Sequence, residues 1–133
     1  MLNTFPQLLT YGFFAPTILR ILVAFAFFSI AYLQASRRKE ISETGFPFIG
    51  KPDPTLVLIS ALIVAATGFA ILLGWHLQLA ALVGLVICIK HAIFATKYPR
   101  AIPLCRGEYI QLTVILLTLL ISGAGAFAMD LPL

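Results

Sequence analysis

Charged residues are scarce in this chain, and their scarcity decides its class. Of the 133 residues, 11% are Asp, Glu, Lys or Arg, whereas 61% are hydrophobic. If this chain were a water-soluble domain, its few polar residues could not cover so much apolar surface. The composition therefore predicts one integral membrane domain and leaves no room for a soluble catalytic module.

The sequence also lacks the spacings typical of metal and nucleotide sites. It contains no Cys-x-x-Cys or His-x-x-x-His pair, no phosphate loop and no dinucleotide fingerprint. Its two histidines, His76 and His91, are about 22 Å apart along one helix, so they cannot both bind one iron. Cys88 and Cys105 both lie on the side of the chain that the distribution of Lys and Arg, described below, assigns to the cytoplasm. A disulfide is disfavoured in that reducing compartment. No metal site and no redox pair of cysteines is predicted.

What the chain does have is four long apolar runs. Each has about 20 residues, the length that crosses the hydrocarbon core as a helix. The predicted spans are residues 15–35, 55–75, 77–97 and 108–129. Pro6 and Gly12 interrupt the residues before them, so we expect 1–14 to form an interfacial segment ahead of a single membrane domain, 15–133. The predicted fold is an all-α up-down bundle of four membrane helices.

Lys and Arg residues gather at one side of these spans. Eight of the nine lie in or beside the first and third connections, namely Arg37, Arg38, Lys39, Lys51, Lys90, Lys97, Arg100 and Arg106. The positive-inside rule places these connections in the cytoplasm and both termini outside, in the inner (cytoplasmic) membrane of the cell. The charges flank spans and do not form a dense patch, so no nucleic-acid partner is expected.

Small and aromatic residues predict how the helices pack. Small residues recur every four positions on the second and third spans, and such ridges let helix backbones approach closely in lipid. They are Ala66, Ala70 and Gly74, then Ala80, Gly84, Cys88, Ala92 and Thr96. The short Gly74-Trp75-His76 turn makes these two spans antiparallel neighbours. Trp75, Tyr98 and Tyr109 occupy positions expected of interfacial aromatics.

Arg20 is the one cation on the outer half of the spans. A guanidinium at this depth is costly, so we expect it to face the bundle interior or to extend to the interface. Ala24, Ala31 and Ala35 lie near its helical face, which favours a neighbouring helix. Two roles remain open: contact with an anionic or quinone-like group, and a structural or topological hydrogen bond.

The fourth span has a polar stripe along one helical face, predicted to look inward. Its residues are Glu108, Gln111, Thr118, Ser122 and Gly125. Glu108 lies at the predicted cytoplasmic mouth and at a helix start. It is interpreted either as a helix cap or partner of Arg106 or Lys97, or as a proton or substrate contact at the mouth of the stripe.

His91 lies about 60° from the small-residue face of the third span, whereas Lys90 points to the opposite side. We therefore expect Lys90 to extend to the cytoplasmic interface and His91 to lie inside. His91 is open to two interpretations, an interior titrating group or a hydrogen-bonded packing residue.

The ordered set of these segments resembles the DoxX family of small four-helix membrane proteins. The matching segments are 15–22 with its Leu19-Arg20 pair, 67–74 followed by 79–82, Glu108-Tyr109, and 122–130. The resemblance covers nearly all of the chain from about Leu8. Two family features differ: residues 31–35 lack the usual Gly-x-x-Lys-like end of the first helix, and Val64 lies near the position where many members have a Glu.

The resemblance implies a membrane subunit of a redox or respiratory complex, with quinone as the implied ligand and lipid, other membrane proteins or further copies of the chain as partners. Ligand contacts would come from Arg20, His91, Glu108, Gln111 and Ser122. Whether the chain is an enzyme stays open, and no catalytic residue is assigned. The alternatives are an accessory subunit without chemistry and, third, a transporter or channel subunit that requires several copies.

Overall fold

The computed structural model of the chain describes residues 12–45, 50–99 and 102–123. Its elements are helices, and the four longest correspond to the four apolar runs. They are η1 (Gly12–Phe14), α2 (Ala15–Ser36), α3 (Arg38–Glu43), α4 (Pro54–Leu73), α5 (Leu77–Lys97) and α6 (Arg106–Ser122). The all-helical class predicted from the composition is confirmed for this part of the chain.

Proline and glycine set the ends of the helices. Pro16 and Pro54 lie in the first turns of α2 and α4, where a missing N–H costs no intrahelical bond. Gly74 ends α4 in a left-handed conformation with φ 66°, and the Trp75 N–H donates back to the Ala70 carbonyl at 3.1 Å. His76 is also left-handed, with φ 44°, so only Trp75 and His76 separate Gly74 from the start of α5, which turns back antiparallel to α4, as predicted.

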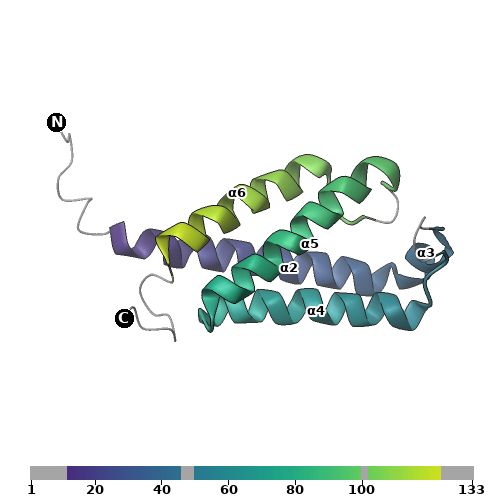
Figure 1. The fold of residues 1–133 in the computed structure, drawn as a ribbon. Helices are drawn as coiled ribbons and strands as arrows, with labels where there is room; N and C mark the ends of the chain where they lie inside the picture. Colours follow the sequence, from purple (N-terminus) through teal and green to yellow (C-terminus); the bar gives the residue numbers. More distant parts are fainter. Residues whose placement is uncertain (1–11, 46–49, 100–101, 124–133) are drawn as a thin grey trace.

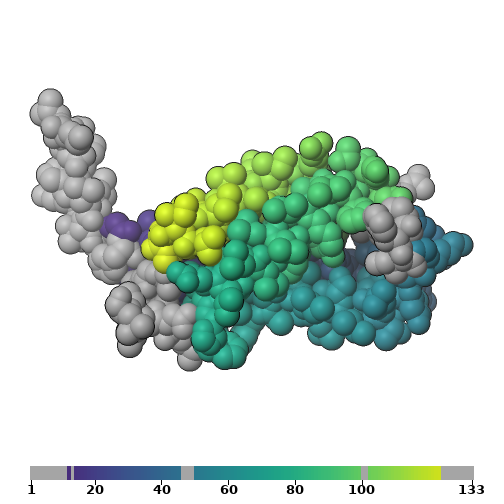
Figure 2. Space-filling view, viewed as in Figure 1, coloured from purple at the N-terminus to yellow at the C-terminus, as the bar shows by residue number. Residues whose placement is uncertain are grey.

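The helices associate mainly as two pairs, α2 with α4 and α5 with α6 (Figure 1). Contacts between α4 and α5, and fewer between α2 and α6, join the pairs, and the space-filling view has α5 between α4 and α6 (Figure 2). Figure 1 shows α3 and the connection from α5 to α6 at one end of the molecule and the α4–α5 turn at the other. The described basic connections therefore share one end, here called the basic end.

Phe27 of α2 lies at the centre of the core, fully buried. A Cβ added at Gly68 of α4 would lie 2.9 Å from the Phe27 Cβ, and one added at Gly84 of α5 would lie 3.2 Å from the Phe27 Cζ. Both glycines therefore allow neighbouring helices to approach α2 closely. The predicted ridge on α5 is inside as far as Cys88. On α4, Gly74 is buried and Ala70 packs against the core as predicted, but Ala66 is exposed and Gly68 makes the close approach.

The exterior of the molecule is strongly apolar. Phe25, Val86 and Ile121 are 71%, 68% and 86% exposed, which is typical of side chains in contact with lipid. Helices α2, α4 and α5 are each long and apolar enough to cross a membrane. Helix α6 has 17 residues and ends at Ser122, because Gly123 leaves the helical conformation; residues 124–129 of the predicted fourth span lie outside the described residues. So does the predicted interfacial segment, apart from η1.

Candidate functional site

Polar and aromatic side chains from all four long helices meet inside the molecule towards the basic end. They are Gln34 of α2, Ser60 of α4, His91 of α5 and Tyr109 of α6, here called the four-helix cluster. Gln34, His91 and Tyr109 are 5%, 2% and 0% exposed, and Ser60 is half-buried. Buried polar groups of this kind are expensive in an apolar surrounding unless they bond to one another.

Hydrogen bonds in the cluster fix the state of the imidazole. The His91 Nδ1 lies 2.7 Å from the Ile87 carbonyl oxygen, which can only accept, so Nδ1 carries a proton. The Nε2 atom lies 2.7 Å from the Gln34 Nε2, and an amide nitrogen can only donate. With the Gln34 amide in this orientation, the His91 Nδ1 is the donor and Nε2 the acceptor. The Ser60 hydroxyl lies 3.5 Å from the Gln34 Oε1 and links α4 to this pair.

Tyr109 closes the cluster from the side of α6. Its ring stacks on the His91 ring, with centroids 5.2 Å apart and planes at 21°. Its buried hydroxyl lies beside the Leu104 backbone, at the connection before α6. The cluster is thus a closed core in which Gln34 and His91 satisfy each other, and its geometry suits the alignment of helices better than the binding of a substrate.

Arg20 lies near the opposite end and is 3% exposed. Its Nη2 donates to the Leu72 carbonyl oxygen of α4 at 3.3 Å, in the last turn before Gly74. Ala24 and Ala31 are buried along the same face of α2, so the prediction that Arg20 faces a neighbouring helix is confirmed. That neighbour is α4.

The predicted inward orientation of that stripe is wrong. Glu108, Gln111, Thr118 and Ser122 are all exposed, and Gly125 lies outside the described residues. The inner face of α6 is instead formed by Tyr109, Leu112, Leu116 and Leu119. The physical reason is packing: Leu116 fills the space beside Gly84, and large side chains make this contact better than Ser or Thr. The Thr118 hydroxyl bonds to the Val114 carbonyl of its own helix.

Glu108 and Lys90 are two charged residues near the basic end for which the sequence made predictions. The Glu108 carboxylate accepts from the Cys105 N–H at 2.7 Å, and the two residues form a capping box at the start of α6. The contacts of Glu108 therefore agree with its interpretation as a helix cap. Lys90 is exposed while His91 is buried, as the helical angles predicted.

The remaining reactive side chains do not assemble into a second site. Cys88 is buried and Cys105 exposed, and both thiols are free. Within 12–45, 50–99 and 102–123, no three His, Cys, Asp or Glu side chains lie together as a metal ion would require. Searches for related proteins return no matching family model, no similar curated protein and no similar solved structure. Function must therefore be argued from the geometry.

Of the residues predicted from the sequence, only His91 belongs to the four-helix cluster. Gln34 and Tyr109 were missed as members of a site, since one ends an apolar run and the other resembles an interfacial aromatic. A signal was present for Gln34. It is the only amide within the first span and lies fourteen residues, close to four turns, after Arg20, which places both on one face of the helix.

Proposed function

We propose that this chain is a four-span protein of the inner (cytoplasmic) membrane with both termini outside the cytoplasm. Support comes from the three long apolar helices, from α6 as the described part of a fourth span, and from their alternating directions. The described Lys and Arg residues of the connections share the basic end, the side that the positive-inside rule assigns to the cytoplasm.

The two free cysteines offer a direct test of this orientation. Cys105 is exposed at the basic end, so a membrane-impermeant maleimide should label it in inverted vesicles and not in intact spheroplasts. Cys88 is buried and should stay unlabelled until the protein is denatured. A Cys105→Ser variant controls for background, and a Trp75→Cys variant in that background should show the opposite pattern. Labelling of Cys105 from outside would contradict the proposed topology.

Within that membrane, the function we propose is that of an accessory subunit without catalytic chemistry. The four-helix cluster is the main support, because its Gln34–His91 pair is closed and its bonds join α2 to α5. The exposed polar stripe of α6 adds to this, since Gln111 and Ser122 on a lipid-facing surface favour a protein neighbour that covers them. If the DoxX resemblance holds, the larger assembly is a redox or respiratory complex.

The subunit role predicts that α6 is the docking helix. Thr118→Trp places a bulky side chain in the polar stripe and should shift the protein, extracted in a mild detergent, from a larger species to the single-chain mass on native gels and in native mass spectrometry. Val86→Trp, on the exposed face of α5, is the matched control and should leave the larger species intact. A wild-type protein that always runs as a single chain would count against the subunit role.

A quinone-binding subunit is the second candidate, and the buried Arg20 favours it. A guanidinium held beside the Leu72 carbonyl is a strong donor for a quinone oxygen or an anionic group. Quinone should then co-extract with the purified protein and be lost in Arg20→Ala. A lipid extract without quinone, together with unchanged quinone-linked turnover in Arg20→Ala membranes, would eliminate this candidate. Transport is the weakest candidate, because Phe27, Ile30 and Tyr109 fill the interior.

A further inference from the structure

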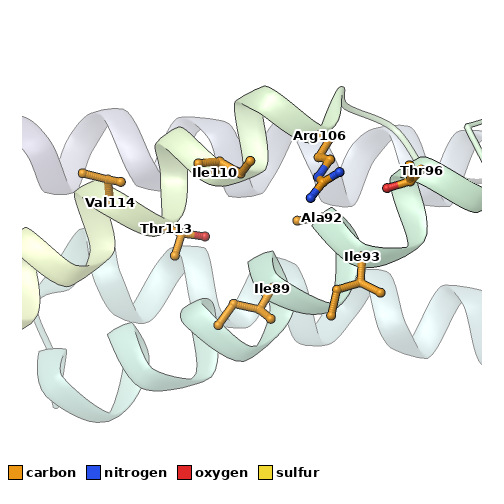
Figure 3. Close-up of a pocket in the computed structure, with 8 residues that line it drawn as sticks. All are labelled: Ile89, Ala92, Ile93, Thr96, Arg106, Ile110, Thr113 and Val114. Carbon is orange, nitrogen blue, oxygen red and sulfur yellow. The ribbon is translucent and has the colours of Figure 1, made fainter.

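A groove runs along the outside of the molecule between α5 and α6, near the basic end (Figure 3). Its volume is about 350 Å³, within the usual size range of small-molecule sites. Its lining is mostly aliphatic, with two threonines and one arginine: Ile89, Ala92, Ile93, Thr96, Arg106, Ile110, Thr113 and Val114. The groove lies on a face of α6 different from that of the polar stripe.

The only charge in the groove is Arg106, at its end nearest the α5–α6 connection. Figure 3 shows the Arg106 side chain extending from the start of α6 towards Ala92 on α5, with Thr96 at the same end. Glu108 is engaged in the helix cap with the Cys105 N–H, and no Asp or Glu is among the residues that line the groove. The guanidinium is therefore available to an external anion.

The opposite end of the groove is apolar. Ile89 and Val114 form it, and the Thr113 hydroxyl donates to the Tyr109 carbonyl of its own helix, so it presents little polarity to the groove. A ligand that matches both ends has an anionic head and a hydrocarbon tail lying along the helices. Phospholipids have this form, and basic pockets between membrane helices bind their phosphate groups.

We propose that the α5–α6 groove is a binding site for an anionic phospholipid, with its headgroup phosphate on Arg106 and one acyl chain against Ile89, Ile93 and Val114. The phosphate is a bidentate partner for the guanidinium, and the acyl chain covers apolar surface that α5 and α6 leave between them. This site is separate from the proposed subunit role and does not depend on it.

Native mass spectrometry of the full chain, with phosphatidylglycerol and phosphatidylcholine of identical acyl chains, tests the site. The wild type should retain one phosphatidylglycerol more tightly than phosphatidylcholine, because both lipids carry the phosphate but the choline cation of phosphatidylcholine repels the Arg106 guanidinium. Arg106→Gln should lower the apparent association constant for phosphatidylglycerol by about tenfold, the order of one charge-assisted hydrogen bond. Arg38→Gln removes an equal charge at the same end of the molecule but outside the groove, and should lower it by less than about twofold.

A variant that fills the groove tests the acyl-chain contact separately from the phosphate contact with Arg106. Ile89→Trp should reduce retention of both lipids while the helical circular dichroism stays unchanged, because the indole occupies the space of the acyl chain at the apolar end of the groove. Equal losses in Arg106→Gln and Arg38→Gln would show a diffuse charge effect and overturn the site. So would equal retention of the two lipids by the wild type, or tight binding of a neutral quinone that Arg106→Gln leaves unchanged.

Discussion

Replacement of Gly68 by alanine is expected to lower the free energy of unfolding by about 1–3 kcal/mol, the usual cost of overpacking a core. The added Cβ would lie 2.9 Å from the Cβ of Phe27 and 3.5 Å from the Ala24 carbonyl oxygen. Neither atom belongs to the free end of a flexible side chain, so α2 and α4 must move apart. Reversible unfolding in mixed detergent micelles, followed by circular dichroism, measures the change.

Alanine substitutions at two other helical glycines, Gly84 and Gly107, serve as controls of graded severity for the same measurement. At Gly84 the nearest atoms are the ends of the Phe27 and Leu116 side chains, at 3.2 Å, and these can shift slightly, so Gly84→Ala should cost less than Gly68→Ala. At Gly107 nothing lies within 4 Å of an added Cβ, and Gly107→Ala should be neutral or slightly stabilising. If all three variants have the same stability, the close approach of α2 and α4 at Gly68 is refuted.

The helix boundaries were predictable because they depend on local residues. Predicted spans 15–35, 55–75 and 77–97 correspond to α2 (Ala15–Ser36), α4 (Pro54–Leu73) and α5 (Leu77–Lys97). Pro16 and Pro54 mark two starts, and Gly74 marks an end, through backbone preferences that act whatever the tertiary surroundings. The length of each apolar run supplies the rest.

The inward faces were only partly predictable, because a membrane helix has apolar residues on all sides. In water, the polar stripe of α6 would indicate the solvent side, whereas in lipid a polar stripe is expected to turn inward. The structure has Leu112, Leu116 and Leu119 inside and Gln111 and Thr118 outside. Side-chain fit beside Gly84 decides this orientation, and fit depends on the partner helix, which no single-helix pattern contains.

The four-helix cluster required tertiary structure for a similar reason. His91 was placed inside from its angle to Gly84 and Cys88, which is a property of α5 alone. Its partner Gln34 lies 57 positions earlier in the sequence, and Tyr109 comes from α6, across the connection that follows α5. Only the pairing and relative register of the helices bring these residues together, and neither can be obtained from the spacing within one run.

The bond between Gln34 and His91 should show a measurable coupling in a double-mutant cycle. Gln34→Met keeps the size of the side chain but leaves the His91 Nε2 without its donor, at a cost of about 1–3 kcal/mol for an unsatisfied buried group. His91→Phe preserves a ring to stack on Tyr109 while removing the acceptor. The double variant should lose less than the sum of the single changes, by about 0.6 kcal/mol, the mean coupling for hydrogen bonds between membrane helices, and by about 1.7 kcal/mol at most.

Ser29→Ala provides the matched control for that cycle, because its hydroxyl bonds only to the Phe25 carbonyl of the same helix and is exposed. Combined with His91→Phe, it should give strictly additive losses. Additivity of Gln34→Met with His91→Phe would contradict the cluster as a link between α2 and α5. Coupling would show that the buried polar groups of this protein hold its helices in register, which is the function expected of a subunit that presents α6 to a partner.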